Sequence, residues 1–437
     1  MENTIIFTSK LARYPEPAAE AVLTKNHLAW QQEGNKQQLC LDDVVGTSLV
    51  DYGDDLQPCL LVSAYPQAKA NLAHKQHRSL QEYYFTCENL AQRSQWQKAI
   101  DNTLVGRDID AKIEPRHLEV IINPHSGKAK AIAIFERIRP LFDRANFSYN
   151  VTKTKSAADT KAVVRNLNLA TTDGLVIVGG DGTIHDAIAG LMSRQDRERA
   201  IKMPLGIIPG GSGNGLCKSI LVQGSKSSDP LNAAFIVARG KQQSLDLMRV
   251  SQGDRQYYSL LSLAWGLISD VDLESEKLRF LGAYRFDVYA LFLMTLLRTY
   301  RGKFSFLPHH DCQIYGNQTL CESAEWQEIT DDFIFLWAMN TPWAAEDMNV
   351  TPYAKLNDGA IDVLVMRRGT SRRELLQALL RCGKGLHLDL PHMEYYKVRA
   401  FKLEPLTDKG ILLVDGEQVD YANIEMQVLP NLAVVNC

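Results

Sequence analysis

The stretch from Gly174 to Leu191, GLVIVGGDGTIHDAIAGL, places a cluster of glycines around a single aspartate. Its apolar run from Leu175 to Val178 is short, rich in β-branched residues and closed by glycine, which predicts a buried strand. Beyond the glycines, apolar residues recur at the spacing of an amphipathic helix. We therefore expect Gly179 to Gly182 to form a strand-to-helix turn, and the unpaired backbone N–H groups of such a turn bind anions.

Three further segments could bind the same anion. They are NPHSGK (Asn123 to Lys128), the pair Thr152 and Thr154, and GGSGN (Gly210 to Asn214), and each follows a run typical of a strand. Glycine lets a backbone approach phosphate oxygens closely, hydroxyl and amide side chains donate further hydrogen bonds, and Lys128 can add a positive charge. The sequence thus predicts a nucleotide site whose phosphates lie over these turns.

Asp181 lies in the middle of the glycine cluster, and two interpretations of it stay open. It could be a turn residue whose carboxylate caps the following helix. An acid beside phosphate is repelled unless it accepts a proton or holds a metal, which favours a role in phosphoryl transfer. The chain has no GxxxxGK[ST] loop, and its first strand lacks the GxGxxG pattern with a later acidic residue, which disfavours P-loop ATPases and dinucleotide dehydrogenases.

Alternating strands and helices must position these turns. From Leu118 the chain repeats strand, loop and helix, with LEVIIN, FSYNVTKT, GLVIVGGDG and PLGIIP as the strands. Units of this kind build a doubly wound α/β domain with a parallel sheet, whose ligands lie at the carboxyl ends of the strands. We assign this nucleotide-binding domain to residues 113–244.

The two flanking regions, residues 1–112 and 245–437, show the alternation that is typical of antiparallel strands. The first ends in the helical segment NLAQRSQWQKAIDNTL, which carries Trp96. Strands followed by such a helix resemble a pleckstrin-homology domain, although an extra β layer without a ligand fits equally well. The second region is expected to be a β-rich lipid-binding domain with two helices, one containing YALFLMTLLRTY and one opened by a capping box from Ser371 to Glu374.

The composition is that of an ordinary soluble globular protein, with 45% hydrophobic residues, 23% charged residues and a formal net charge of -3. This charge gives no reason to propose a nucleic-acid partner. The eight cysteines form no CxxC pair and the first residues lack the apolar core of a signal peptide, so we expect a cytoplasmic location. The longest apolar stretch, Val288 to Leu297, is about half as long as a membrane-spanning helix, so we expect peripheral and reversible membrane contact.

The motifs GGDGT, PGGSGN and NPHSGKAK together resemble the catalytic domain of the diacylglycerol-kinase superfamily of lipid kinases. Within it the chain is most similar to sphingosine kinases, because of SLAWGLISDVDLESEKLRFLGAYRF, LRTYRGKFSFLP, HMEYYKVRAFKLEP and GILLVDGEQV. The resemblance covers Leu118 to the end of the chain. It implies phosphorylation, by ATP, of the primary hydroxyl of sphingosine or a related sphingoid base, with Mg²⁺ held mainly by the ATP phosphates.

The resemblance also implies roles for individual residues. Asp181 falls on the catalytic aspartate, which acts as general base, and Asp272 falls on the acid that meets the lipid head group. Some relatives have arginine at His125, and Ala129 replaces a glycine of the first loop. The expected nucleotide contacts are Asn123, His125, Ser126, Gly127, Lys128, Thr152, Gly180, Gly182, Gly211, Ser212, Gly213, Asn214, Arg279, Arg285, Asp415, Gly416 and Glu417. The expected lipid contacts are Asp270, Asp272, Leu273, Glu276, Leu291, Phe292 and Leu296.

The chemistry of a sphingoid base agrees with these acids, because its ammonium group lies near the attacking hydroxyl and needs a carboxylate. Asp270 and Asp272 offer two, which share one side of an extended segment but diverge in a helix. A solvated surface pair has the same pattern. The segment from Tyr289 to Leu297 could line the slot for the lipid tail or simply pack in the core.

Two other functions stay open. Ceramide and diacylglycerol have no ammonium group, so a kinase for either would not need Asp272. A catalytically inactive lipid-binding homologue is the second alternative, but the intact GGDGT motif with Asp181 favours an active enzyme. The sequence leaves the oligomeric state open, and a homodimer is compatible with it.

Overall fold

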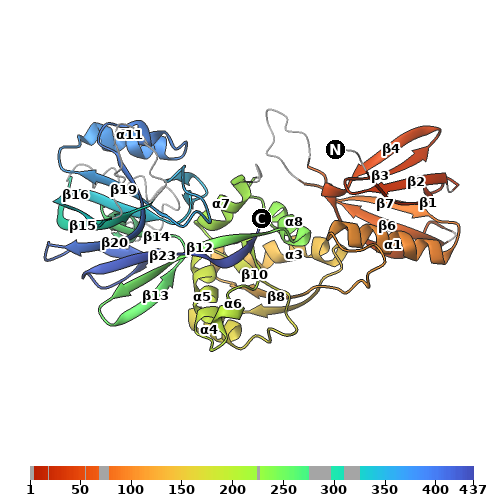
Figure 1. Ribbon diagram of the computed structural model, residues 1–437, viewed down its shortest axis with the longest axis horizontal. Helices are drawn as coiled ribbons and strands as arrows, with labels where there is room; N and C mark the ends of the chain where they lie inside the picture. The colour runs from red at the N-terminus through yellow and green to blue at the C-terminus, as the bar shows by residue number, and fades with distance from the viewer. Residues whose placement is uncertain are drawn as a thin grey trace.

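The computed structural model describes residues 4–17, 19–54, 56–67, 78–223, 227–274, 297–309 and 325–437. Figure 1 shows three regions in a row, an N-terminal sheet, a central α/β region and a C-terminal β-rich region. Two long strands, β12 (Gln242–Gln252) and β23 (Ile424–Asn436), run from the central region into the C-terminal one (Figure 1). This arrangement confirms the predicted fold class.

The N-terminal region is a seven-stranded antiparallel sheet in the order β4-β3-β2-β1-β7-β6-β5. Helix α1 (Leu90–Leu104) packs against this sheet and buries Trp96 completely, while the Trp96 indole N–H donates to the Lys10 carbonyl at 3.3 Å. The likeness to a pleckstrin-homology domain stays a prediction. The strands are β1 (Ile5–Arg13), β2 (Ala19–Thr24), β3 (His27–Gln32), β4 (Asn35–Cys40), β5 (Val44–Tyr52), β6 (Gln57–Ala64) and β7 (Gln81–Thr86), with a 3-10 turn η1 (Leu41–Asp43).

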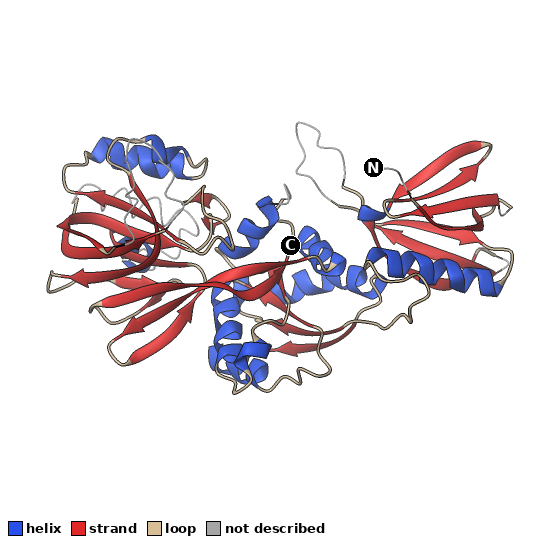
Figure 2. Cartoon of the chain, viewed as in Figure 1, coloured by secondary structure: helices blue, strands red, loops and turns tan. Residues whose placement is uncertain are grey.

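The central region has four parallel strands, β8 (His117–Ile122), β9 (Ser148–Lys153), β10 (Gly174–Gly179) and β11 (Leu205–Pro209), in the order β11-β10-β8-β9. Every residue of β10 and β11 is buried, as expected for parallel strands covered on both faces. Helices pack on both sides of the sheet, α3 with α8 and α4 with α5 (Figure 2). The helices are α2 (Ser126–Ala129), α3 (Ala131–Arg144), α4 (Ala157–Arg165), α5 (Asp181–Met192), α6 (Arg197–Ala200), α7 (Gly215–Gln223) and α8 (Pro230–Arg239).

The C-terminal region is β-rich, and four of its strands, β15, β16, β19 and β20, pair in a closed ring. Helix α11 (Arg372–Cys382) opens with the predicted capping box, in which Ser371 and Glu374 bond each other's backbone N–H groups. The remaining elements are β13 (Arg255–Ser259), β14 (Ser262–Gly266), α9 (Leu267–Glu274), β15 (Tyr300–Pro308), β16 (Gln327–Met339), β17 (Trp343–Ala345), β18 (Met348–Asn349), β19 (Ile361–Arg367), η3 (Leu386–Asp389), β20 (Glu394–Pro405), β21 (Leu412–Val414) and β22 (Glu417–Gln418).

One sheet runs through the central and C-terminal regions. Strand β23 pairs in parallel with β11, where Val435 faces Leu205, and antiparallel with β12 and β20. The pairing of β12 with β23 shifts register at Asp246, whose buried carboxylate accepts the N–H groups of Gly359 and Asn431, each at 2.6 Å. Because the two regions share hydrogen-bonded strands, their relative position is fixed by the sheet itself.

Two expectations from the sequence concern apolar helices. The predicted helix from Tyr289 to Leu297 lies almost wholly outside the described residues, and Tyr300 already begins β15. Within the described part of the chain, no helix combines the length and the apolar character that a membrane crossing requires.

Candidate active site

The glycine-rich loops meet at the carboxyl edge of the parallel sheet. Strand register aligns Val178 with Ile122, and Gly179 with Pro209, so β8, β10 and β11 end level with one another. The loops then touch, because a Cβ atom on Gly127 would lie 2.2 Å from the Gly210 carbonyl oxygen. The glycines are thus needed for the loops to pack against one another, in addition to any contact with phosphate.

The outer face of these loops is open. A Cβ atom on Gly182 would meet no atom within 4 Å, and both Gly182 and Ser212 are exposed. Gly182 lies in the first turn of α5, where backbone N–H groups have no partner within the helix. This edge therefore offers backbone donors of the kind that hold phosphate groups.

Two predicted nucleotide residues instead hold the loops together with their side chains. The Asn123 amide donates to the Thr183 hydroxyl at 3.0 Å and accepts the His125 N–H at 3.1 Å. The Asn214 amide accepts the Gly211 N–H at 2.9 Å and donates to the Gly211 carbonyl at 3.0 Å. These amides fix the shape of the first and third loops.

Asp181 bridges the second and third loops. It is the first residue of α5, and its carboxylate accepts the N–H groups of Gly215 at 2.9 Å and Leu216 at 3.1 Å. These N–H groups open α7, so the interpretation of Asp181 as a cap for its own helix is wrong. Its side chain caps the helix that follows β11, which points the carboxylate toward the GGSGN loop.

Opposing effects act on the pKa of Asp181. Burial raises it, the N–H groups of Gly215 and Leu216 lower it, and the negative charge of Asp415 raises it again. The net result is a pKa above the ordinary value for aspartate. A carboxylate with a raised pKa is a better proton acceptor, as a general base requires.

Asp415 lies inside the protein, although we expected it to contact the nucleotide. Its side chain is only 1% exposed. Its φ of 50° and the φ of 81° at Gly416 form a two-residue hairpin turn between β21 and β22, which leaves Gly416 and Glu417 exposed. The carboxylate accepts five hydrogen bonds, from His185 Nδ1 (2.8 Å), Ser259 Oγ (2.7 Å) and the N–H groups of Leu260 (3.0 Å), Leu261 (2.9 Å) and Ser262 (2.9 Å).

The C-terminal region also contacts the third loop directly. Asn214 forms an isolated β-bridge with Ala345, and its amide donates to the Glu346 carboxylate at 3.1 Å. The Glu346 N–H in turn donates to the Gly213 carbonyl at 3.0 Å. The segment after β16 therefore holds the GGSGN loop by hydrogen-bonding contacts through Asn214 and Gly213.

Other predicted nucleotide residues are less central in the structure. The Thr152 hydroxyl donates to the Glu119 carboxylate at 2.8 Å, beside the end of β8. Ser126 opens the short helix α2. The Lys128 side chain, Arg279 and Arg285 lie outside what the structure describes.

Of the two cases left open for Asp270 and Asp272, the structure has the helical one, in which the two side chains diverge. Both belong to α9, and a helix turns residues two positions apart to different sides. Asp270 is buried, accepts a hydrogen bond from the Tyr300 hydroxyl and lies 3.6 Å from an Arg298 nitrogen, whereas Asp272 is half-buried. Leu273 is also half-buried on α9. Glu276, Leu291, Phe292 and Leu296 lie outside the described residues.

Sequence reasoning missed His185 and Glu346. His185 had one local signal, because it follows Asp181 by a single helical turn. Its partner is 230 residues away along the chain, and the Asn214 partner Glu346 is 132 residues away, so no local pattern could have paired them.

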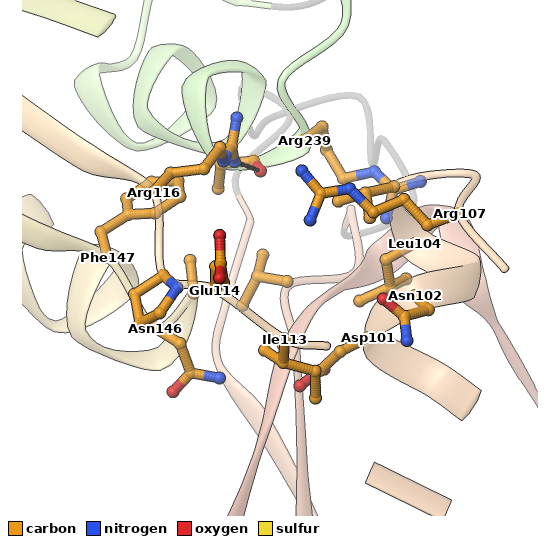
Figure 3. A pocket seen from close by; sticks show the side chains of 16 residues that line it. Asp101, Asn102, Leu104, Arg107, Ile113, Glu114, Arg116, Asn146, Phe147 and Arg239 are labelled. Atoms are coloured by element: carbon orange, nitrogen blue, oxygen red, sulfur yellow. Dashed lines mark hydrogen bonds between the residues drawn. The ribbon is translucent and has the colours of Figure 1, made fainter. Parts of the chain in front are cut away.

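A separate cavity of about 90 Å³ lies where the N-terminal sheet meets the α/β region (Figure 3). Asp101 lines it, with one oxygen accepting the Thr47 hydroxyl at 2.9 Å and the other buried without a hydrogen-bond partner among the described residues. Burial raises the pKa of Asp101 to about 7. Arg239 of α8 donates to the carbonyl oxygens of Leu41 at 3.1 Å and Val44 at 3.0 Å, so this junction ties the two regions together. The cavity shares no residue with the glycine loops.

Comparisons with known proteins agree with this geometry. Residues 117–250 match the diacylglycerol kinase catalytic domain, and residues 317–436 match the YegS C-terminal NAD kinase beta sandwich-like domain. The chain is 37% identical to sphingosine kinase 1 of Arabidopsis thaliana, covering 69% of this chain and 68% of that protein. It is 32% identical to sphingosine kinase 1 of Homo sapiens, covering 72% of this chain and 90% of that protein. A crystal structure of a diacylglycerol kinase from Bacillus anthracis, 15% identical, shares the fold over 74% of this chain and 98% of its own, with a TM-score of 0.52.

Proposed function

The chain belongs to the sphingosine kinase family of ATP-dependent lipid kinases, and we propose that it phosphorylates the primary hydroxyl of sphingosine or a related sphingoid base. The products are then sphingosine 1-phosphate, or its relative, and ADP. The observation that carries the proposal is the Asp181 carboxylate, which is held at the turn between β10 and α5 by the N–H groups of α7.

In the proposed reaction the ATP phosphates lie over the open edge of the glycine loops, near Gly182 and Ser212. Asp181 accepts the proton of the lipid hydroxyl while the hydroxyl oxygen bonds to the γ-phosphorus and the bond from the γ-phosphorus to the β-phosphate oxygen breaks. The transition state of phosphoryl transfer is loose, so the loops contribute mainly by positioning and by hydrogen bonds to the phosphate oxygens.

The donors of this edge suit phosphate, since they are backbone N–H groups, and the Asp181 carboxylate suits either a proton or a cation. Mg²⁺ bound together with ATP would neutralise charge on the phosphates. The described residues contain no group of three or more His, Cys, Asp or Glu side chains arranged to hold a metal.

The lipid head group is assigned to Asp272. Asp270 accepts a hydrogen bond from Tyr300 and lies 3.6 Å from an Arg298 nitrogen, and these contacts anchor α9. We assign Asp272 to the ammonium of the substrate because it falls on the head-group acid of the family. Removing one partner of a charge pair in a pocket closed by the lipid costs far more than removing one at an exposed surface. We further propose a cytoplasmic enzyme that contacts membranes peripherally and reversibly.

The test is a panel of sphingosine, dihydrosphingosine, ceramide and diacylglycerol, each with ATP labelled at the γ-phosphate. We expect label in the two sphingoid bases, and its loss when EDTA is present in excess. Label mainly in ceramide or diacylglycerol would overturn the substrate. No label in any lipid would instead support the inactive homologue.

A further inference from the structure

Helix α5 carries two groups that face the rest of the site. Asp181 begins the helix, and His185 follows one turn later on the same side. His185 Nδ1 lies 2.8 Å from an Asp415 carboxylate oxygen, and the His185 side chain is 21% exposed. The helix that presents the catalytic aspartate is therefore bonded directly to the hairpin that carries Glu417.

The five donors to Asp415 come from two regions. Ser259 and the N–H groups of residues 260–262 belong to the C-terminal region, in the turn between β13 and β14. Of the five, His185 alone comes from the α/β region. The bond from His185 to Asp415 is thus the point at which the β21–β22 hairpin is attached to α5.

We propose that His185 is a positioning residue, which holds the β21–β22 hairpin against α5 and so fixes Glu417 relative to Asp181. The inference rests on the proposed kinase function and adds a residue for that same site. His185 does not touch the reacting atoms and acts through Asp415.

The charges around this bond favour its ionised form. Burial lowers the pKa of His185, but the hydrogen bond and charge of Asp415 outweigh burial and raise it. Asp186 on α5 also raises this pKa and Lys161 on α4 lowers it, while Tyr257 on β13 lies close to the Asp415 charge. The imidazolium–carboxylate attraction is therefore present at low pH and is lost as the pH rises through the raised pKa of His185.

Two substitutions distinguish the effect of the hydrogen bond to Asp415 from the effect of the titrating imidazole ring. His185→Ala removes the donor, whereas His185→Asn keeps an N–H group attached to Cγ, as Nδ1 is, and does not titrate. Asp186→Asn is the matched control, because it removes the adjacent ion pair with Lys161, 3.3 Å apart, and leaves Asp415 its donor. Each variant is assayed for kcat and both KM values from pH 6 to 9, and for amide hydrogen exchange of residues 412–418 without substrate.

We expect His185→Ala to lower kcat about 10- to 100-fold, with smaller changes in the KM values, because the reacting groups are misaligned rather than lost. Its 412–418 segment should exchange about tenfold faster or more. His185→Asn should keep kcat within about threefold of the wild-type value. The wild-type kcat should fall as the pH rises through the pKa of His185, and this fall should be absent in the Asn variant, whose side chain does not titrate. Asp186→Asn should match the wild-type protein in exchange and in kcat at pH 7.

Unchanged exchange in His185→Ala, or unchanged kcat, would overturn the proposal, as would an Asn variant as impaired as the Ala variant. The exchange measurement does not depend on the substrate. If His185→Ala loosens the hairpin while the wild-type enzyme labels ceramide or diacylglycerol, the attachment is supported and only the proposed substrate is wrong.

Discussion

Asp181→Asn tests both the chemistry and the architecture of the site. The structure gives this side chain two roles, since the carboxylate is the proposed base and also accepts the two N–H groups that open α7. Loss of a general base typically costs about 10²- to 10⁴-fold in rate. In free energy of activation that is about 2.7–5.5 kcal/mol.

The structural cost adds to the chemical one. An asparagine at position 181 offers one oxygen to two donors, so its amide N–H₂ must face the N–H of either Gly215 or Leu216. A buried donor without an acceptor costs about 1–3 kcal/mol. We therefore expect Asp181→Asn to lower the free energy of unfolding by about that amount and to weaken the binding of ATP analogues, because the GGSGN loop precedes α7.

The assay combines kcat with both substrates varied, ATP-analogue binding and chemical denaturation. Ser156→Ala is the control, because the Ser156 hydroxyl caps α4 in the same region by accepting the Asp159 N–H at 3.2 Å. The control should lose about 1 kcal/mol of stability with no fall in kcat. An Asp181→Asn variant with near wild-type turnover would refute the base, and one with unchanged stability would refute the cap.

Four further substitutions test the structure. The pKa of Asp101 in the folded protein is about 7, above the ordinary value of 3.8, so the stability of the wild-type protein should fall as the pH rises between those values. Asp101→Asn should abolish that fall, and in urea unfolding at pH 8 the variant should be more stable than the wild-type protein by up to about 4 kcal/mol. Gly215→Ala places a Cβ atom 2.5 Å from the Trp343 carbonyl oxygen, so the Tm should drop and ATP binding should weaken. The Cβ atom of Gly182→Ala meets no neighbour within 4 Å, so this variant should bind ATP more weakly while its Tm stays unchanged. Asp272→Asn should raise the KM for sphingosine about 100-fold with the KM for ATP unchanged, and equal damage to both KM values would contradict the assigned role.

The α/β region could be predicted from sequence because its signals are local. The buried run before Gly179, the glycine turn and the helical spacing after Asp181 lie within one short segment, and each follows from the geometry of strand and helix. The same holds for the capping box at Ser371 and Glu374. Local rules suffice where the partners are close in sequence.

Helix α9 shows where the sequence left two local structures open. Strand β14 ends at Gly266, which has a φ of 79°. Gly266 lies so close to the neighbouring strand β16 that a Cβ atom on it would be 2.5 Å from the Ile334 carbonyl oxygen. The chain turns there and enters a helix, which separates Asp270 from Asp272. The burial of Asp270 depends on Tyr300 and Arg298, which come from a later part of the chain.

Besides the N–H groups of α7, the C-terminal region restrains the surroundings of Asp181. Strand β23 pairs with β11 and so continues the catalytic sheet into that region. The Glu346 carboxylate holds Asn214 of the third loop, and Asp415 holds His185 on the helix of Asp181. Because the loops, the proposed base and the C-terminal region are bonded to one another before any substrate binds, aligning them costs free energy during folding rather than in the reaction. Damage to these long-range bonds should therefore appear in kcat before it appears in the affinity for either substrate.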